Sequence, residues 1–143
     1  MASKMRLRVA TPDSEKFNDD VEMVIMRCIS GDMGILPYHE ATSAVLDCGV
    51  LRILNDYSER RMAVFGGIVQ VRNNTVTLIA NDAQWPEEID VALVESERER
   101  LAGRAKENLD GLDEQKDKIM IRRNLVQKEV SEYSGTSKTK RES

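Results

Sequence analysis

The sequence contains few of the residue types on which metal sites and redox centres depend. It has two cysteines and one histidine in 143 residues. Cys28 and Cys48 lie far apart with no CxxC spacing, which argues against a zinc knuckle or a redox pair and favours two reduced, buried thiols over a disulfide. His39 has no neighbouring histidine or cysteine. The sequence therefore predicts neither a metal site nor a bound cofactor.

Long apolar runs and an excess of positive charge are also missing. No run approaches the roughly 18 apolar residues of a membrane-spanning helix, and the first residues, MASKMRLRVA, lack the apolar stretch of a secretory signal. The net charge of -4 and the pI near 5.2 exclude the basic surface of a general nucleic-acid binder. We therefore expect a protein made and kept in the cytosol, with no nucleic acid among its partners.

Patterns that carry enzyme chemistry are absent as well. The glycines at positions 31, 34, 66 and 67 form neither GxGxxG nor a GKS or GKT loop, so they predict turns and bulges, not a phosphate-binding site. Asp32 and Glu40 form no recognisable acid/base pair, and no base lies beside a candidate nucleophile. The sequence predicts a protein without catalytic activity of its own.

What the chain does contain is divided into two parts near Pro86. Residues 1–86 hold 20 charged side chains, whereas residues 87–130 hold 21 in about half the length. A segment so rich in charge can bury only a narrow apolar stripe. We predict one domain at residues 1–86, a differently built appendage at residues 87–133, and a disordered polar tail at residues 134–143.

The first part has the alternation of short β-strands. Pro12 and Asp13 predict a turn within residues 10–17, and Asn73-Asn74 predicts a tight hairpin turn because asparagine tolerates positive φ. Gly49 predicts a bulge or a close backbone approach. The expected strands are residues 5–9, 21–29, 45–54, 61–72 and 75–80. Short strands at this spacing favour an antiparallel β sandwich or a barrel.

The second part changes to a helical period. The stretch WPEE at residues 85–88 predicts a helix start, since proline suits the first turn and glutamates favour the positive end of the helix dipole. A break at Asp110-Gly111 separates two helices. The first is expected to bury Val91, Val94, Leu101, Ala105 and Leu109, and the second Leu112, Ile119, Val126 and Tyr133. The pattern predicts an antiparallel helical hairpin with a thin apolar stripe, whose position depends on packing against something else.

Residues 31–40, GDMGILPYHE, combine two glycines, a proline and the only histidine with apolar side chains. A catalytic loop and a shaped docking edge both fit this composition. Ile35 and Leu36 are expected to be buried. Asp32 is either a turn residue or a contact residue, and His39 either a solvated or core side chain or a contact residue.

In their order, a short β sandwich, the GDMGILPYH loop, the segment MAVFGGIVQVRNNTVTLIANDAQ and the helix opening EEID resemble the epsilon subunit of F-type ATP synthases. The resemblance covers roughly residues 5–130. The loop, the Gly66-Gly67 pair and the strand end VTLIANDA carry it, because together they are more specific than any one motif. The family usually has glycine and then HAP where this chain has Tyr38 and His39-Glu40-Ala41, so the outer end of the loop is expected to contact its partner differently.

The resemblance implies a non-catalytic subunit at the foot of a rotor. In this family the sandwich grips the gamma subunit and rests on the c-ring, which conducts protons or sodium ions. The location implied is the cytoplasmic side of the bacterial plasma membrane, where the chain would be a peripheral part of the complex. The loop would then be a docking edge, and Asp32, Met33, Tyr38 and His39 are the expected contact residues for the c-ring and gamma.

The resemblance also assigns a regulatory role to the hairpin. In relatives it folds beside the sandwich or extends along gamma toward the catalytic alpha and beta subunits, where it restrains ATP hydrolysis. Three basic residues of the second helix, Arg122, Arg123 and Lys128, are the expected inhibitory contacts. The alternative is a helical pair that packs permanently on gamma or on the sandwich, with its charges merely solvated.

Some members of the family bind ATP through an Ile-Asp-x-x-Arg-Ala motif in the hairpin. This chain keeps Ile89 and Asp90 but has Leu93 and Val94 in place of the Arg-Ala pair. The remaining candidates for nucleotide contacts are Arg100 and Arg122. Because one expected cation is missing, we predict weak ATP binding or none. In the alternative, Asp90 only favours the start of its helix and Ile89 packs beneath it.

Two other classes of protein share part of this pattern. A free-standing adaptor built from a sandwich and a coiled coil would show the same change in composition, but it has no need of the glycine-rich loop and the paired glycines. A small-molecule binding module is the other alternative, and ligand titration of the isolated chain would test it.

Overall fold

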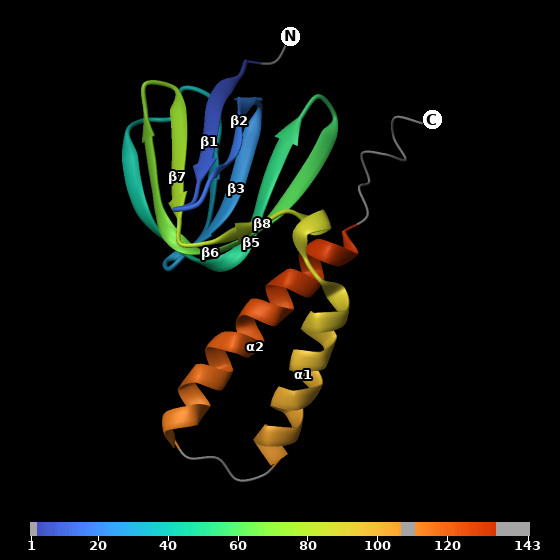
Figure 1. The fold of residues 1–143 in the computed structure, drawn as a ribbon. Coiled ribbons are helices and arrows are strands. Elements are labelled where there is room, and N and C mark those ends of the chain that lie inside the picture. Colours follow the sequence, from blue (N-terminus) through green and yellow to red (C-terminus); the bar gives the residue numbers. More distant parts are fainter. Residues whose placement is uncertain (1–2, 107–110, 134–143) are drawn as a thin grey trace.

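The computed structural model describes residues 3–106 and 111–133, and it has strands in the first part and helices in the second (Figure 1). The strands are β1 Met5–Ala10, β2 Glu15–Val21, β3 Met23–Cys28, β4 Gly31–Ile35, β5 Thr42–Asn55, β6 Ser58–Arg72, β7 Thr75–Ala80 and β8 Ala83–Gln84. The helices are a 3-10 turn, η1 Pro86–Glu88, and two α-helices, α1 Val91–Lys106 and α2 Gly111–Glu132. The predicted β sandwich followed by a helical hairpin is confirmed. The expected tail, with Leu109 and Asp110, lies outside the described residues.

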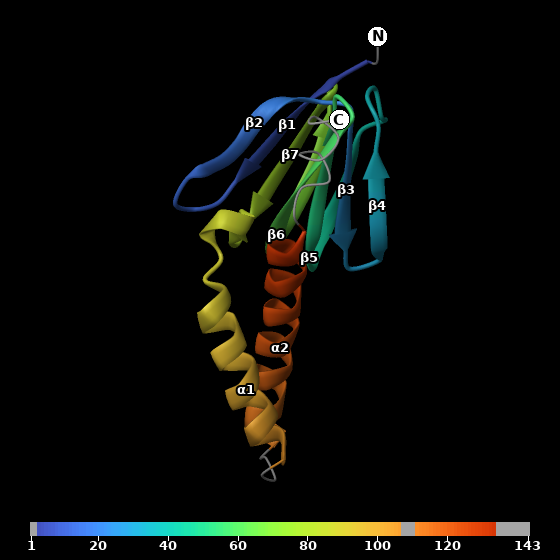
Figure 2. The ribbon, with the colours of Figure 1, turned by 90° about the vertical axis from the view of Figure 1, so that its right-hand side faces the viewer.

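The strands form one hydrogen-bonded sheet that folds back on itself. Its order is β2-β1-β7-β6-β5-β3-β4, and β8 pairs with β6. All pairs are antiparallel except β1 with β7, which run parallel. The two longest strands, β5 and β6, pair along almost their whole length and connect the two layers (Figure 2). The edges of the sheet are therefore β2 and β4.

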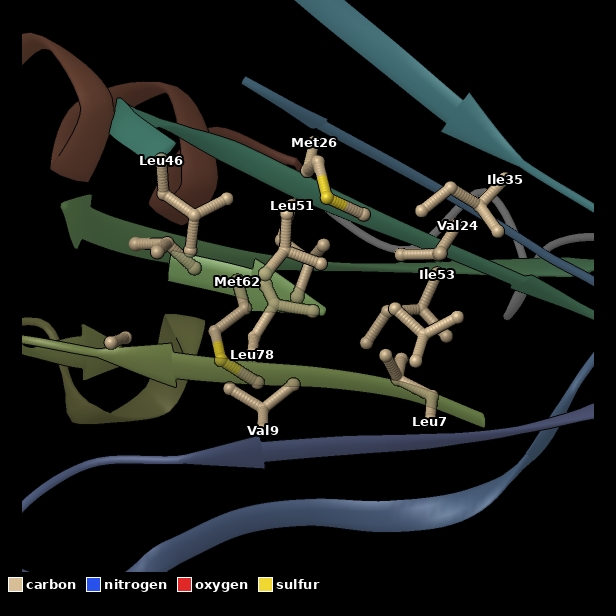
Figure 3. Packing of buried hydrophobic residues seen from close by; sticks show 14 of the residues in the cluster. Leu7, Val9, Val24, Met26, Ile35, Leu46, Leu51, Ile53, Met62 and Leu78 are labelled. Atoms are coloured by element: carbon tan, nitrogen blue, oxygen red, sulfur yellow. The ribbon is translucent and has the colours of Figure 1, made fainter. Parts of the chain in front are cut away.

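Apolar side chains from both layers fill the space between them (Figure 3). Leu7 and Val9 of β1 face Leu51 and Ile53 of β5 across the core, and all four are almost completely buried. Each such side chain stabilises the fold by about 1.5 to 3 kcal/mol through removal from water. The alternation of buried and exposed residues in β1 is the pattern that the sequence predicted, and β7 occupies the predicted residues 75–80.

The turn at Asn73-Asn74 is the predicted hairpin. Both residues have positive φ, 51° and 55°. The side chain of Asn74 also ties two neighbours to the turn: its Nδ2 donates to the backbone oxygen of Lys4 at 2.9 Å, and its Oδ1 accepts from the backbone N–H of Tyr38 at 2.8 Å. Gly49 is likewise confirmed as a close approach, because a Cβ there would collide with the side chain of Arg27.

Two strand predictions were wrong, because β2 and β4 were expected to be a turn and a loop. The turn expected over residues 10–17 is confined to residues 11–14: the backbone N–H of Thr11 donates to the backbone oxygen of Ser14 at 2.8 Å, and β2 begins at Glu15. The strand β2 was not predicted because its sequence is mostly polar, and an edge strand exposed on both faces needs few apolar residues. The strand expected over residues 21–29 is confirmed as β3, Met23–Cys28, although its first residue, Val21, ends β2.

Half of the expected loop at residues 31–40 is the edge strand β4, which pairs with β3. Ile35 is buried in the core as expected, but Leu36 is 57% exposed, against the prediction. The strand β4 was not predicted because its sequence, GDMGI, is rich in glycine and has only one of the β-branched residues that usually mark a strand.

The long helix does not begin at Pro86. Residues Pro86–Glu88 form one 3-10 turn, and α1 begins at Val91, where the Oδ1 of Asp90 accepts from the backbone N–H of Leu93 at 3.1 Å. The predicted stripes are also partly wrong. Val94 and Leu101 are buried, but Val91 and Ile119 are exposed, and α2 ends one residue before Tyr133.

The corner of β6 is built on Gly66 and Gly67, whose φ angles are 77° and 134°. A Cβ on Gly67 would collide with the backbone oxygen of Ile79 and lie 2.7 Å from the Cα of Ala80. Only glycine fits a site where positive φ and the neighbouring strand both exclude a side chain. This corner lets β6 pass from one layer of the sandwich to the other.

We predict that Gly67→Ala lowers the free energy of unfolding by about 2 to 4 kcal/mol, because it adds backbone strain and a clash with β7. Urea denaturation followed by circular dichroism measures this change. Gly103→Ala is the control: a Cβ there meets nothing within 4 Å, so it should strengthen α1 by up to about 1 kcal/mol. Wild-type stability of the Gly67 variant would show that the corner is not a strict requirement.

Candidate functional site

The hairpin projects beyond one end of the sandwich, and the C-terminal half of α2 contacts the outer face of β5 and β6 (Figures 1 and 2). The apolar part of this contact is small. It consists of four buried residues, namely Ala63, Ile89, Val94 and Val130, with Val50, Phe65 and Val126 packed around them. The hairpin is therefore docked on the sandwich through a cluster much smaller than the core of the sandwich itself.

Polar contacts surround this small cluster. The Nη2 of Arg122 donates to the Oδ2 of Asp47 at 2.9 Å, and the Nη2 of Arg123 donates to the Oδ2 of Asp82 at 2.8 Å. The guanidinium of Arg123 also lies over the ring of Phe65, 3.9 Å from its centre. We call Arg122, Arg123, Asp47, Asp82 and Phe65 the rim of the docking interface.

All three basic residues expected to make inhibitory contacts are therefore engaged within the chain. Arg122 and Arg123 bind the sandwich at the rim, and the Nζ of Lys128 lies 3.6 Å from the Oε1 of Glu95 in α1. In this arrangement none of them is available to bind another subunit without first breaking its own ion pair. Each pair is partly exposed to solvent, so each is individually weak.

The C-terminal end of α2 is fixed by a second polar cluster. The guanidinium of Arg61 lies over the ring of Tyr133, 4.2 Å from its centre. Glu59 accepts from Arg61 at 2.7 Å and from Arg52 at 2.9 Å. The hydrogen bond from Arg52, followed by that from Arg61, holds the pKa of Glu59 below its ordinary value despite partial burial.

The connector between sandwich and hairpin is anchored to the sandwich. The carboxylate of Glu88 accepts from the backbone N–H of Trp85 at 2.8 Å and from the Nζ of Lys16 at 2.9 Å. Both hydrogen bonds lower the pKa of Glu88, and the bond from Trp85 has the larger effect. The ring of Trp85 lies under Arg60, whose guanidinium is 4.0 Å from the ring centre. The chain therefore leaves the sandwich only after η1.

The four expected partner contacts do not lie together. Asp32 and Met33 are near the start of β4, whereas Tyr38 and His39 follow its other end, close to the Asn73-Asn74 turn. Asp32 is exposed and lies 3.7 Å from Arg27. Met33 packs partly against the core. Substitution of Met33 is therefore a poor test of its contact with a partner subunit, because truncation of this side chain would also weaken the core of the sandwich.

At the other end of β4, Tyr38 is 74% exposed and has a positive φ of 65°. The backbone N–H of Tyr38 is held by Asn74, so the strained residue presents its ring to solvent. His39 is half-buried, and its Nδ1 lies 2.8 Å from the backbone oxygen of Glu40. The two ends of β4 are therefore separate candidate contact points.

The four candidates for nucleotide contacts have other roles or are exposed. Ile89 is buried in the small apolar cluster, and Asp90 caps α1. These are the roles that the alternative interpretation gave them. Arg122 is bound to Asp47, and Arg100 is exposed on α1. As arranged here, Ile89 and Asp90 serve the packing and start of the helix.

One surface was missed by the sequence reasoning. Ile29, Val45, Ile68 and Ile79 form a row across neighbouring strands: Ile29 donates its N–H to the backbone oxygen of Val45, Val45 pairs with Ile68, and Ile68 pairs with Ile79. Each of the four is 42% to 69% exposed. We call these residues the apolar row. The signal that could have found it is the continuous run VTLIA, which places apolar residues on both faces of β7.

Other kinds of site find little support in the part of the chain that the structure describes. It holds no group of three or more histidine, cysteine, aspartate or glutamate side chains placed to bind a metal, and no helix long and apolar enough to cross a membrane. An open groove of about 470 Å³ lies between residues 41–43 and 70–73. Its lining is mostly small and polar, with one charged side chain, Arg72. An open, weakly apolar groove is a poor small-molecule site.

Comparison with known proteins gives the class first. Residues 4–86 match the family model of the ATP synthase Delta/Epsilon chain beta-sandwich domain. The ATP synthase epsilon chain of Alkalihalophilus pseudofirmus is 40% identical over 102 residues, which are 71% of this chain and 77% of that protein. The chain therefore belongs to the family of ATP synthase epsilon chains, as the loop, the paired glycines and the strand end predicted.

Solved structures agree on the fold. A chain of the Euglena gracilis mitochondrial ATP synthase, solved as OSCP/F1/c-ring, has a TM-score of 0.78 at 20% identity over 90% of this chain and 81% of that one. A chain of the Tetrahymena thermophila mitochondrial ATP synthase, solved as central stalk and c-ring, has a TM-score of 0.52 at 25% identity over 61% of this chain and 70% of that one. The match to the Euglena chain covers 90% of this chain, so it includes part of the hairpin as well as the sandwich.

The cluster around Glu59 predicts a stability that depends on pH. Because the pKa of Glu59 is lowered on folding, its contribution is complete above the unfolded value of about 4.5 and is lost as the pH falls through the folded value. Glu59→Gln should therefore cost about 1 kcal/mol at pH 7 and progressively less below pH 4.5. Urea denaturation at a series of pH values measures both quantities.

The control is Glu87→Gln, at an exposed position of the connector, which should leave the unfolding curve unchanged at each pH. A cost for Glu59→Gln that stays constant down to pH 3 would show that the carboxylate charge is not what stabilises the cluster.

Proposed function

We propose that the chain is a non-catalytic subunit of the central stalk of an F-type ATP synthase. In this role the sandwich links gamma to the c-ring and so couples proton or sodium ion flow to ATP synthesis, while the hairpin restrains ATP hydrolysis. The observation that carries the proposal is the division of the sandwich's outer face: one part is covered by the hairpin, and the adjoining part keeps an apolar row uncovered.

The apolar row is the surface that we assign to gamma. A row of four exposed aliphatic residues across paired strands is an unusual surface for a chain that acts alone, and it favours burial against another protein. Sheet hydrogen bonds hold its side chains at fixed spacing, so it is rigid before binding. A rigid apolar surface loses little conformational entropy when it docks.

The two ends of β4 are the surfaces that we assign to the rest of the rotor. Asp32, at one end, offers an exposed carboxylate to a basic group of the c-ring. Tyr38 and His39, at the other end, offer an aromatic and a polar contact to a partner that lies elsewhere on the complex. Because the length of β4 separates the two ends, we expect their substitutions to affect different contacts.

The restraint of hydrolysis rests on the hairpin. Its basic residues Arg122, Arg123 and Lys128 are held by partly exposed carboxylates in the docked arrangement. Acidic loops of the alpha and beta subunits could exchange for these carboxylates at small net cost, because one solvated ion pair replaces another. The location that follows is peripheral, on the cytoplasmic side of the bacterial plasma membrane. Weak ATP binding or none stays a prediction for the hairpin.

Removal of residues 87–143 should raise ATP hydrolysis by the assembled enzyme, since it removes all three basic contacts. The fragment 1–86 should still join the complex, because it holds the sandwich core and the apolar row. Steady-state hydrolysis by purified complexes that contain either chain measures the effect. Unchanged hydrolysis would favour a hairpin that packs permanently, and a fragment that failed to assemble would overturn the division of roles.

Ile68→Asp should weaken binding to gamma by about tenfold or more, because a carboxylate in the middle of the apolar row must lose its water on docking. Isothermal titration of the purified chain into gamma measures the affinity. Tyr57→Asn is the control, since Tyr57 is almost fully exposed at the β5–β6 turn and lies outside the row. Equal affinities for both variants would move the gamma contact away from the row.

A further inference from the structure

The open groove between residues 41–43 and 70–73 lies at the end of the sandwich away from the helices, where β6 ends and β5 begins (Figure 1). It is next to the apolar row. Ser43 pairs with Gln70, two residues along the same strands from the pair of Val45 with Ile68. Residues two apart in a strand point to the same side of a sheet. The groove therefore continues the surface that the apolar row begins.

The lining of the groove suits a carboxylate. Among the lining residues only Arg72 carries a charge, and it is exposed at the end of β6. Thr42 and Ser43 add hydroxyl groups, and Gln70 and Asn73 add amide groups. Hydroxyl and amide groups donate hydrogen bonds to an anion, and a guanidinium binds a carboxylate through two parallel hydrogen bonds. The groove can thus hold one carboxylate with several donors around it.

Arg72 differs from the other arginines of the sandwich because it has no partner. Six of the seven arginines in residues 3–90 are engaged with a carboxylate or an aromatic ring, namely Arg6, Arg8, Arg27, Arg52, Arg60 and Arg61. The guanidinium of Arg72 makes no hydrogen bond, ion pair or ring contact with any residue that the structure describes. It is therefore free to bind a carboxylate of another molecule.

The apolar row and the groove can contribute different properties to one interface. Burial of aliphatic side chains has no preferred direction, so the row alone does not fix how a partner is oriented. An ion pair at a set distance from the row does fix the orientation. Arg72 follows Ile68 by four residues in β6, which places their Cα atoms about 13 Å apart. A partner that fits both must present an apolar patch and a carboxylate at this separation.

We propose that the groove receives an aspartate or glutamate side chain of the protein that docks on the apolar row, and that Arg72 orients this partner. The assignment of the partner to gamma rests on the proposed function, whereas the pairing of a carboxylate with Arg72 rests on the groove itself. In this interface the row supplies most of the affinity. Arg72 supplies the orientation, and its charge speeds association by attraction at a distance.

Surface plasmon resonance with immobilised gamma and the full chain in solution tests this pairing, in about 0.05 M and about 0.5 M sodium chloride. Arg72→Glu should weaken binding by about tenfold or more in low salt, because two carboxylates would then face each other. Arg72→Gln should lose a few-fold, chiefly in the association rate, and should be less sensitive to salt than the wild type. Arg72→Lys keeps the charge, so it should keep the salt dependence with a smaller loss of affinity.

The matched control is Tyr57→Asp, which lowers the net charge by one, as Arg72→Gln does. Tyr57 is almost fully exposed at a turn outside both the groove and the row, and aspartate tolerates the positive φ of 65° found there. This variant should bind gamma as the wild type does. A loss of affinity equal to that of Arg72→Gln would show that only the net charge of the chain matters, and it would overturn the pairing.

Comparison with Ile68→Asp separates this inference from the proposed function. If Ile68→Asp weakens binding but Arg72→Glu binds as the wild type does in both salt concentrations, gamma docks on the row and the groove is not a carboxylate site. If Arg72→Glu weakens binding and Ile68→Asp does not, the groove stands and the assignment of the row to gamma is wrong. Wild-type affinity of both variants would overturn the two together.

Discussion

The sharp bend of β6 at Gly66-Gly67 is the constraint on which the rest of the structure depends. Because positive φ and the close backbone of β7 exclude any side chain there, the strand can turn from one layer of the sandwich into the other. The bend also divides the outer face. Ile68 and Val45 lie on one side of it and belong to the apolar row, whereas Phe65 and Ala63 lie on the other and receive α2. One corner thus creates both candidate docking surfaces.

The two carboxylates of the rim sit at the border between these surfaces. Asp47 is in β5 opposite the bend, and the backbone oxygen of Asp82 accepts from the N–H of Phe65 at 3.0 Å. The sandwich core contains many buried apolar residues, whereas the separate cluster between the sandwich and the hairpin contains only four. Parts of a protein with few buried apolar contacts open at lower free energy than its core. We therefore expect the hairpin to open at lower free energy than the sandwich.

The sequence predicted the fold where local chemistry decides it. Alternation marked β1, and Asn73-Asn74 marked the hairpin turn between β6 and β7, because both signals depend on neighbouring residues alone. The strand β2 was missed, since an edge position allows polar residues on both faces, and the glycine-rich β4 was read as loop. The helical stripes were partly wrong because a seven-residue apolar period cannot show that α2 buries Asn124 and exposes Ile119.

The candidate sites were harder to predict because they depend on contacts between distant segments. The basic residues of α2 were recognised, but their partners Asp47 and Asp82 lie some forty or more positions earlier in the chain. The run VTLIA marks an outward apolar residue on β7, but the apolar row joins residues from four separate segments, and their strand register is not visible in that run. Resemblance to a family supplied the expected roles, and only the three-dimensional arrangement showed which residues already bind one another.

The central claim is that the hairpin docks reversibly on the outer face of β5 and β6, and a distance measurement tests it most directly. Spin labels on Ser43→Cys and Leu125→Cys, both exposed positions, would be placed in a chain that also carries Cys28→Ala and Cys48→Ser. The account predicts one short distance for the chain alone and a second, longer population once it is assembled with its partner subunits. A single distance, unchanged between the isolated chain and the complex, would contradict it.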